Sequence, residues 1–446
     1  MHGGEHPGVD LTAPGASGDT EFNVGYLTRV EGEGSLRLKV RAGEVTEARL
    51  SIFEAPRYFE KLVVGRTPDE VLDIIARICG ICPIAYQMSA VHAFEDHFGI
   101  EVDPEVQQIR RLLYAGEWIQ SHALHIYMLH APDFLGFPSA LAMAGTHRAA
   151  VERGLKLKKI GNRLIAAIGG RAIHPVSVRV GGFTRAPRKA DIDKVRALVD
   201  EAIPLAQETV DMVASFTAPD FHREALMVSM KHETDYPYSQ GRIVSNRGMD
   251  IALNEWDTCF AEQHVEGTNA LHARTADGEV YLLGPSSRVT LAADQLHPLA
   301  KEALDRTGLA EEIRTNIYWS IAARAVELLH AFAEARDILD AYKEPAQVLV
   351  PWQARAGRAA WATEAPRGMC WHRYEIDEAG RIAEAQIVPP TSQNQARIEE
   401  DLRVFAPTVL HLPKPEATHQ IEQMIRSYDP CISCATHFLD LSIEEV

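Results

Sequence analysis

The apolar residues change their spacing along the chain, and each spacing predicts a different element. Between residues 22 and 55 apolar and polar positions alternate, with Leu36 and Leu38 on one face and Gly43 at a turn. A period of two predicts a strand hairpin. From Pro68 onward the apolar residues recur at three and four positions, which predicts a helix. The chain therefore begins with strands and turns helical.

Helical spacing dominates the middle of the chain. Thr67 precedes the first helical stretch and is a suitable N-cap. Residues 368–388 predict a hairpin that turns at Gly380, followed by short helices at 395–404 and 416–428. The long predicted helices are 83–98, 104–130, 145–168, 188–215 and 310–340. The pattern predicts an α+β fold, predominantly helical, with a helical body and small peripheral β-sheets.

Composition supports one large folded unit. The 446 residues are 46% hydrophobic and 24% charged, as in a soluble globular protein. Residues 1–21 are rich in Gly and Pro and predict a flexible lead-in. No linker of Pro, Gly or Ser divides the rest, so we expect a single domain at 22–437 and a C-terminal extension at 438–446.

Charge and cysteine content limit the class of protein. The net charge of −17 disfavours binding to nucleic acid or to an anionic membrane. No apolar run reaches the ~18 residues that span a bilayer, and no signal peptide is visible. Six cysteines in so long a chain suit a reducing compartment. We therefore expect a cytoplasmic protein.

Four of the six cysteines form two CxxC pairs near opposite ends of the chain. Cys79 and Cys82 make the first pair, and Cys431 and Cys434 the second. Zinc-ribbon pairs are usually ~15–20 residues apart. Here the gap is roughly 350 residues, and closing such a loop costs roughly 2.5 kcal/mol more than closing a 20-residue loop. A structural zinc site, two dithiol redox pairs and a catalytic transition-metal centre stay open, and the last is favoured.

Longer motifs around these cysteines narrow the choice. RICGICP at 77–83 and DPCISCATH at 429–437 resemble the two signature motifs of nickel–iron hydrogenase large subunits. Five more stretches resemble the same family in the same order: 29–34, 57–61, 173–182, 364–368 and 388–391. The stretch at 83–89 is most similar to the cytoplasmic, NAD(P)-linked branch that includes sulfhydrogenases. The resemblance covers nearly the whole chain.

The resemblance implies a ligand set for a Ni-Fe centre. Cys79 and Cys431 would bind nickel alone, while Cys82 and Cys434 would bridge nickel to an iron that carries CO and cyanide. Soft thiolates suit nickel and low-valent iron, so the chemistry agrees with the residue types. Such a centre would cleave H2 reversibly into protons and electrons.

Three further residues would serve catalysis by the same resemblance. Arg367 matches the arginine poised over the metals, and Asp429 is its expected bidentate partner. Glu31 matches the glutamate that passes protons from a cysteine sulfur towards solvent. A carboxylate can do this where burial brings its pKa towards neutrality.

Other matching residues would bind ligands nearby. Glu60, His437 and the backbone carbonyl of Ile387 correspond to a magnesium or iron site near the C-terminus. Thr391 corresponds to the hydroxyl that hydrogen-bonds a cyanide, and Pro390 belongs to the apolar pocket around the diatomic ligands.

The sequence departs from the family pattern at four places. Tyr86 replaces a frequent histidine, Ser121 a frequent aspartate, Gln393 a tryptophan and Glu33 a histidine. None of these four positions is an expected metal ligand; they lie around the residues that are. They bear on redox poise and oxygen sensitivity.

Electrons must leave through a partner. Outside the two pairs the chain has only Cys259 and Cys370, and we expect both to be buried. Two cysteines are too few to bind a series of Fe–S clusters. The sequence also has no GxGxxG fingerprint for binding a dinucleotide. The resemblance implies an Fe–S-containing small subunit, diaphorase subunits that bind FAD and NAD(P), and a maturation endopeptidase acting after His437. Two alternatives are a zinc-bound scaffold and a subunit like the quinone-site subunit of complex I, relatives of which lack the cysteine quartet.

Overall fold

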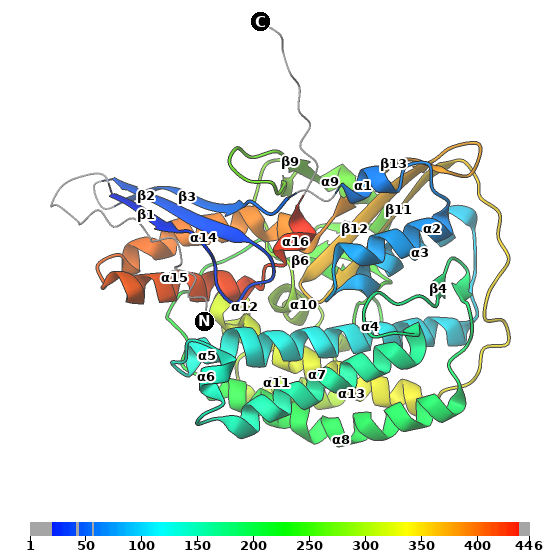
Figure 1. Ribbon diagram of the computed structural model, residues 1–446, viewed down its shortest axis with the longest axis horizontal. Coiled ribbons are helices and arrows are strands. Elements are labelled where there is room, and N and C mark those ends of the chain that lie inside the picture. Colours follow the sequence, from blue (N-terminus) through cyan, green and yellow to red (C-terminus); the bar gives the residue numbers. More distant parts are fainter. Residues whose placement is uncertain (1–19, 42–43, 56–57, 437–446) are drawn as a thin grey trace, which may run out of the picture.

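The computed structural model describes residues 20–41, 44–55 and 58–436, and it shows a helical body with small antiparallel sheets (Figure 1). This is the predicted fold class. The strands are β1 (Thr20–Val24), β2 (Gly34–Arg41), β3 (Glu44–Ile52), β4 (Val178–Arg179), β5 (Gly182–Phe183), β6 (Val228–Lys231), β7 (Arg242–Ser245), β8 (Asp250–Ile251), β9 (Phe260–Gln263), β10 (His272–Thr275), β11 (Gly357–Ala365), β12 (Gly368–Ile376) and β13 (Ile382–Val388).

The helices fill most of the remaining chain. They are α1 (Phe59–Leu62), α2 (Pro68–Ile75), α3 (Pro83–Phe98), α4 (Pro104–Leu124), α5 (Ala131–Phe134), α6 (Ala140–Met143), α7 (Arg148–Gly169), α8 (Lys189–Ala214), α9 (Trp256–Cys259), α10 (Pro285–Leu291), α11 (Pro298–Thr307), α12 (Ala310–Thr315), α13 (Ser320–Asp340), α14 (Pro390–Val409), α15 (Lys414–Tyr428) and α16 (Ile432–Ala435). Shorter turns are η1 (Ala76–Ile78), η2 (His125–His130), η3 (Leu253–Glu255), η4 (Ala293–Gln295) and η5 (Ile317–Trp319).

The N-terminal strands form the predicted hairpin with one more strand beside it. The sheet order is β1-β2-β3, and Leu36 pairs with Leu50 in antiparallel register. Leu36, Leu38 and Leu50 are buried in one apolar cluster with residues of α14 and α15, such as Leu402. Residues 20 and 21, assigned above to the flexible lead-in, are the first residues of β1, because they continue the pairing with β2.

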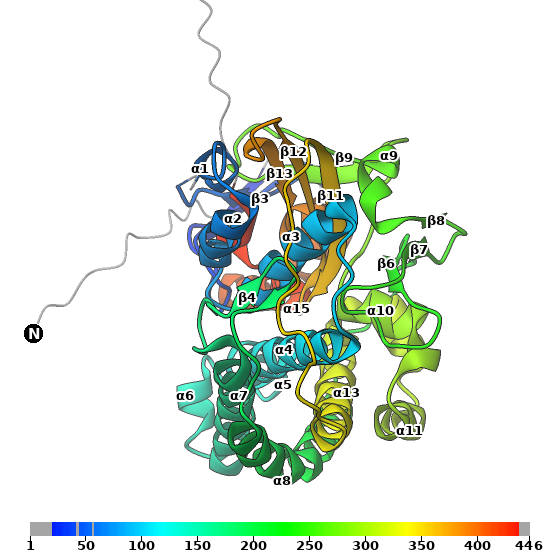
Figure 2. The ribbon, with the colours of Figure 1, turned by 90° about the vertical axis from the view of Figure 1, so that its right-hand side faces the viewer.

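Four long helices, α4, α7, α8 and α13, form the lower layer of the molecule (Figure 2). Two glycines set the approach of α4 and α7. A Cβ atom at Gly116 would lie 2.9 Å from the Ile165 side chain, and one at Gly161 would lie 2.8 Å from the Gly116 carbonyl oxygen. Larger residues at either position would force the two helices apart.

Several predicted helices have different bounds in the structure. The predicted helix 104–130 changes from α-helix to the π-helical turn η2 at His125. The predicted helix 310–340 is broken at Asn316, which is extended and caps η5 by accepting a hydrogen bond from the Tyr318 amide at 3.1 Å. Helix α14 begins at Pro390 rather than at residue 395. Its first turns carry buried polar residues, so they lack an apolar period.

Segments from the N-terminal and C-terminal parts of the described chain meet beside the β11-β12-β13 sheet. Helix α16 lies at the centre of Figure 1, between β3 and α14 on one side and the β12-β13 hairpin on the other. The predicted hairpin 368–388 is confirmed as β12 and β13. Helix α3, which follows the first cysteine pair, packs against β11 and β12. No helix in the described part of the chain combines the length and apolar character needed to cross a bilayer.

Candidate metal centre

The fold brings the four motif cysteines together in the interior. Their sulfur atoms all lie within 4.8 Å of one another, and all four residues are buried. The Cys79 and Cys431 sulfurs are 3.5 Å apart, those of Cys82 and Cys434 are 3.7 Å apart, and those of Cys431 and Cys434 are 2.9 Å apart. None is in a disulfide. The first two of these contacts join the N-terminal cysteine pair to the C-terminal pair.

The first cysteine pair occupies the turn between η1 and α3. Turn η1 ends at Ile78, and Cys82 is the N-cap residue of α3, with Pro83 in the first helical position. The Cys79 sulfur accepts hydrogen bonds from the amides of Ile81 and Cys82, at 3.3 and 3.4 Å. Hydrogen bonds from Cys431 and Cys434 hold the pKa of the Cys79 thiol well below its usual value.

Two residues of α4 hold this turn from outside, and the sequence analysis missed both. The Glu117 carboxylate accepts hydrogen bonds from the amides of Ile84 and Ala85, at 2.6 and 3.2 Å. Gln120 donates to the Ile81 carbonyl at 2.5 Å. Because Cys82 occupies the N-cap without a capping side-chain bond, Glu117 supplies the cap from another helix. Two polar residues three positions apart on a buried helix face were the signal available in the sequence.

Removing the Glu117 cap should weaken the turn that carries Cys79 and Cys82. Glu117→Leu leaves two buried amides without an acceptor, which costs about 1–3 kcal/mol each. We expect a lower unfolding temperature and less nickel in the purified protein. Glu117→Gln keeps one acceptor oxygen, so its unfolding temperature and nickel content should lie between those of Glu117→Leu and the native chain. Thermal unfolding and metal analysis measure both effects.

The matched control is Glu105→Leu, at the first turn of the same helix, where the side chain is partly exposed. It should change stability by no more than about 0.5 kcal/mol. Equal stability and nickel content in Glu117→Leu and Glu105→Leu would refute the capping role.

The second cysteine pair is held against β-structure from the N-terminal region. Asp429 ends α15 in the left-handed conformation, with φ of 54°, and turns the chain towards Cys431. The Ile432 amide donates to the Glu31 carbonyl at 2.9 Å, as an isolated bridge between the two ends of the chain. The Cys431 amide donates to the Thr391 hydroxyl oxygen at 2.9 Å. That bond leaves the Thr391 hydroxyl hydrogen available for another acceptor.

Glu31 contacts one of the four sulfurs, that of Cys431. The Cys431 sulfur lies 3.1 Å from a Glu31 carboxylate oxygen, which also accepts from the Ser433 amide at 3.0 Å. Glu31 is half-buried. Gly32 beside it has φ of +88°, and a Cβ there would lie 2.9 Å from the Ser433 nitrogen. Glycine therefore lets the Glu31 segment approach the second cysteine motif.

Arg367 is bonded to Asp429, close enough to the cysteines for their charge to act on it. Its Nε donates to the Asp429 backbone carbonyl at 2.9 Å, and its Nη2 to the Asp429 carboxylate at 3.0 Å. The contact is thus shared between backbone and side chain, whereas a fork on one carboxylate was predicted. Its Nη1 donates to the Ser121 hydroxyl at 3.3 Å.

Electrostatics keep this guanidinium charged. Burial would lower the pKa of Arg367, but Asp429 and nearby thiolates such as Cys431 raise it well above its usual value. The side chain is 2% exposed. A permanent cation beside the sulfurs offsets part of their negative charge when they are ionised.

The predicted second metal site is only partly within the described residues. Glu60 of α1 lies beside Ile387 of β13, whose amide donates to its carboxylate at 2.7 Å. Both line a cavity of about 30 Å³ together with Cys434 and Thr436. The third predicted ligand, His437, lies outside the described residues. The ligand role of the Ile387 carbonyl stays a prediction.

Other positions singled out in the sequence lie around the quartet or in the core. Tyr86 is buried, and its ring is 5.6 Å from that of His372. Gln393 is buried, and its amide oxygen faces the Trp256 and Tyr281 side chains. The two spare cysteines differ from the expectation in one respect. Cys370 is buried, whereas Cys259 is only partly buried because it ends a short helix near the surface.

The donor set fits a thiolate-bound metal centre. Four buried sulfurs without disulfides present soft ligands from all sides, and a buried arginine balances their charge. Buried thiolates of this number are stable only when a metal or cations compensate them. The fold and the site together define a metalloprotein with a cysteine-ligated centre at its core.

Comparison with known proteins shows which family this is. The family model described as nickel-dependent hydrogenase matches residues 57–155 and 270–437. The chain is 32% identical over 431 residues to sulfhydrogenase 1 subunit alpha of Pyrococcus furiosus, covering 94% of this chain and 98% of the relative. It is 29% identical to the HoxS subunit beta of the NAD-reducing hydrogenase of Cupriavidus necator, covering 93% and 94%.

Solved structures agree on the fold. A chain of an NAD+-reducing [NiFe]-hydrogenase in the H2-reduced state superposes with a TM-score of 0.86 at 24% identity, covering 94% of this chain and 99% of the other. The protein belongs to the nickel-dependent hydrogenase family and is the large catalytic subunit of a nickel–iron hydrogenase. The zinc scaffold and the complex I-like subunit are not favoured.

Proposed function

We propose that the thiolates of Cys79, Cys82, Cys431 and Cys434 would hold the Ni-Fe centre. The observation that carries this proposal is the convergence of the four sulfurs within 4.8 Å. When bound, the two metals supply Lewis acidity that weakens the H–H bond of a bound H2 molecule. The protein residues hold the centre and move protons and charge around it.

Glu31 is proposed to take the proton from the Cys431 sulfur. The 3.1 Å contact between this sulfur and the carboxylate is within reach for proton transfer. The half-buried position of Glu31 provides a route towards solvent. The Ser433 amide donates a hydrogen bond to one carboxylate oxygen, which holds the Glu31 side chain directed at the Cys431 sulfur.

Arg367 and Asp429 are proposed to shape the space beside the metals. The guanidinium is held by two bonds to Asp429 and one to Ser121. Such a fixed planar cation can orient a bound H2 molecule and stabilise negative charge. Lysine would lose the fork geometry.

Thr391 and Pro390 are proposed to contact the CO and cyanide ligands of iron. The Thr391 hydroxyl oxygen already accepts from the Cys431 amide, so its hydrogen can be donated to a cyanide nitrogen. Pro390 is buried at the first turn of α14 and supplies an apolar wall. Polar and apolar ligand surroundings of this kind fix the orientation of diatomic ligands.

Thr391→Val tests this assignment. The valine removes both the donor to the ligand and the acceptor for the Cys431 amide, and the unpaired amide costs about 1–3 kcal/mol. We expect the cyanide stretching bands to shift in the infrared spectrum and the unfolding temperature to fall. Thr391→Ser keeps the hydroxyl and should leave the bands in place. Unshifted bands in the valine variant would contradict the contact.

Glu60, His437 and the Ile387 carbonyl are proposed to hold magnesium or iron next to the quartet. The 2.7 Å hydrogen bond from the Ile387 amide to the Glu60 carboxylate places these two residues side by side, which supports this. Carboxylate and carbonyl oxygens are ligands that magnesium prefers. We also propose that an endopeptidase removes residues 438–446 after the metals are inserted. The match to the family model ends at residue 437, which supports cleavage after that residue.

Electrons are proposed to pass to an Fe–S-containing small subunit and then to NAD(P) or sulfur through diaphorase subunits carrying FAD, in the cytoplasm. The names of the sulfhydrogenase and NAD-reducing relatives support this. The test is reduction of NAD+, NADP+ and polysulfide by the purified assembly under H2. Reduction of an artificial dye alone, with none of the three, would overturn the assignment of the acceptor.

A further inference from the structure

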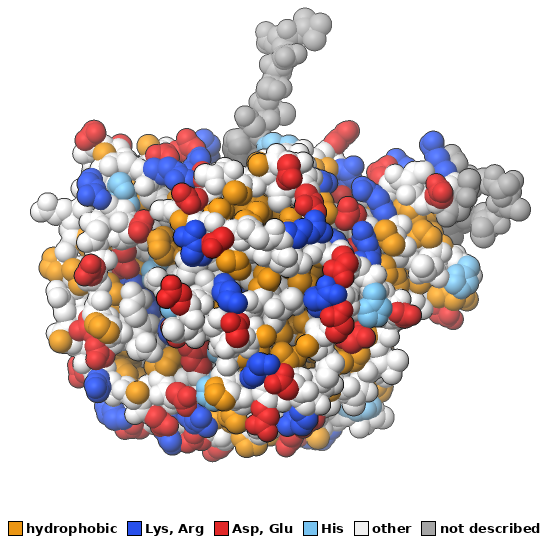
Figure 3. Space-filling model, turned by 180° about the vertical axis from the view of Figure 1, so that it is seen from behind, with side chains coloured by type: hydrophobic (Ala, Val, Ile, Leu, Met, Phe, Trp, Pro, Cys, Tyr) orange, Lys and Arg blue, Asp and Glu red, His pale blue; other side chains and the backbone are white. Residues whose placement is uncertain are grey.

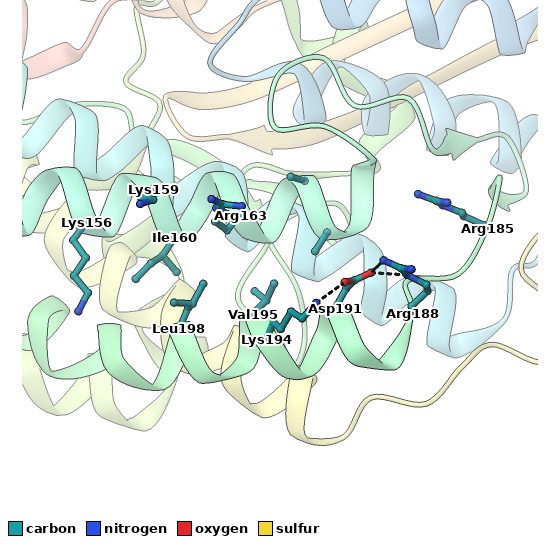
Figure 4. A pocket seen from close by; sticks show the side chains of 12 residues that line it. Lys156, Lys159, Ile160, Arg163, Arg185, Arg188, Asp191, Lys194, Val195 and Leu198 are labelled. Carbon is teal, nitrogen blue, oxygen red and sulfur yellow. Dashed lines mark hydrogen bonds and ion pairs between the residues drawn. The ribbon is translucent and has the colours of Figure 1, made fainter.

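A groove runs along the surface between α7 and α8, away from the four cysteines. It has a volume of about 790 Å³, and two helices and the loop before α8 contribute its walls (Figure 4). Six cationic side chains line it: Lys156, Lys159, Arg163, Arg185, Arg188 and Lys194. One carboxylate, Asp191, lines it as well. The groove therefore carries a strong excess of positive charge.

Half of these cations are paired within the chain and half are not. Asp191 lies 2.6 Å from Arg188 and 3.7 Å from Lys194, and Glu201 lies 3.2 Å from Lys156. The other three are exposed and have neither a hydrogen bond nor an ion pair with any described residue: Lys159, Arg163 and Arg185. Their charge is free to meet an outside partner.

This concentration is unusual for the protein. The whole chain has a net charge of −17. On the opposite face of the molecule, basic and acidic side chains are interspersed (Figure 3). Two exposed arginines outside the groove, by contrast, have carboxylate neighbours: Arg148 has Glu152 at 2.7 Å and Arg306 has Asp211 at 2.6 Å. The groove is thus a basic site on an acidic protein, which favours an acidic ligand.

The shape of the groove indicates an extended occupant. Its lining on α7 runs from Lys156 to Ala167, roughly 16 Å along the helix axis. The cations are spread along this length, as Figure 4 shows from Lys156 to Arg185, and do not converge on one point. A single phosphate would need converging donors. The floor is apolar, with Ile160 and Val195 buried between the basic rims.

We propose that this groove docks an acidic segment of a partner subunit, with apolar side chains against the floor and carboxylates against the rims. Apolar centres with charged rims are the usual composition of subunit interfaces. Complementary rim charges set the rate and salt dependence of association. The inference rests on the proposed function to the extent that the enzyme works with partner subunits.

Crosslinking within the intact assembly tests the contact directly. A carbodiimide joins lysine amines to carboxylates that touch them, and mass spectrometry identifies the joined peptides. We expect Lys159 to be joined to an Asp or Glu of a co-purified subunit. In the double variant Arg163→Glu with Arg185→Glu this crosslink should disappear, and the affinity of the assembly should fall at least about tenfold. The assembly should also dissociate at lower salt, because exposed charge pairs are screened.

The matched control reverses two paired cations on the same helices outside the groove, Arg148→Glu with Lys189→Glu. It has the same change in net charge and should keep the assembly intact. The nickel content of this chain should be unchanged in both double variants, because its four cysteines lie away from the groove, and this separates loss of docking from failure of the metal centre.

Two outcomes would overturn the inference. In the first, the assembly dissociates at the same salt concentration in both double variants and the native chain, and Lys159 is crosslinked only to carboxylates of its own chain. The other is protection of Lys159 from acetylation by inorganic phosphate or by phosphatidylglycerol vesicles and not by the partner subunits. That result would assign the groove to a small anion or a lipid surface.

Discussion

Cys79→Ser should abolish H2 oxidation and remove nickel from the purified protein. The Cys79 sulfur contacts Cys431 across the site and is buried, so a serine oxygen there would be a harder, more weakly acidic ligand. The iron content should fall together with the nickel content, because the remaining three sulfurs no longer complete the ligand set. H2-dependent dye reduction and elemental analysis measure the two effects.

Cys259→Ser is the control for this prediction. Cys259 is partly exposed and lies on α9, apart from the four clustered sulfurs. The same chemical change should leave nickel and activity close to the native values there. Full nickel content and activity in Cys79→Ser would remove Cys79 from the ligand set.

Glu31→Gln should separate proton transfer from metal binding. Glutamine can still accept the Ser433 amide, so the local structure and the nickel content should persist. It cannot take a proton from the Cys431 sulfur, and loss of one general base slows proton transfer by about 10²–10⁴-fold. Exchange between D2 and water, measured by mass spectrometry of the gas, reports this step.

Glu33→Gln provides the comparison, because Glu33 is two residues away and exposed. Its exchange rate should equal that of the native enzyme. Loss of nickel in Glu31→Gln would point to a structural role, and an unchanged exchange rate would show that protons leave by another route.

Much of the fold could be predicted from apolar spacing. Helix α3 has the predicted bounds, and the capping box of Thr67 and Glu70 forms as the N-cap assignment implies. The break at Asn316 could not be predicted, since the apolar period continues across it and a single side-chain cap decides the geometry. The short strands β6 to β10 were also missed, because two to four residues give no readable alternation.

Part of the metal site could likewise be predicted from the sequence, and part could not. The cysteines could be identified from spacing and motifs, but only the fold shows that both pairs converge. The left-handed backbone of Arg29 and Asp429 at motif positions has no signal in composition, because such conformations are held by surrounding structure. The bonds from Glu117 and Gln120 to the first motif were missed for a related reason. They depend on which faces of α4 and α3 meet, and that is a tertiary property.

Metal analysis joined to infrared spectroscopy of the purified assembly tests the central assignment most directly. Sulfurs from both ends of the chain should hold nickel and iron in equal amounts, and absorption bands from CO and cyanide should accompany them. Zinc in place of nickel, with no such bands, would contradict it.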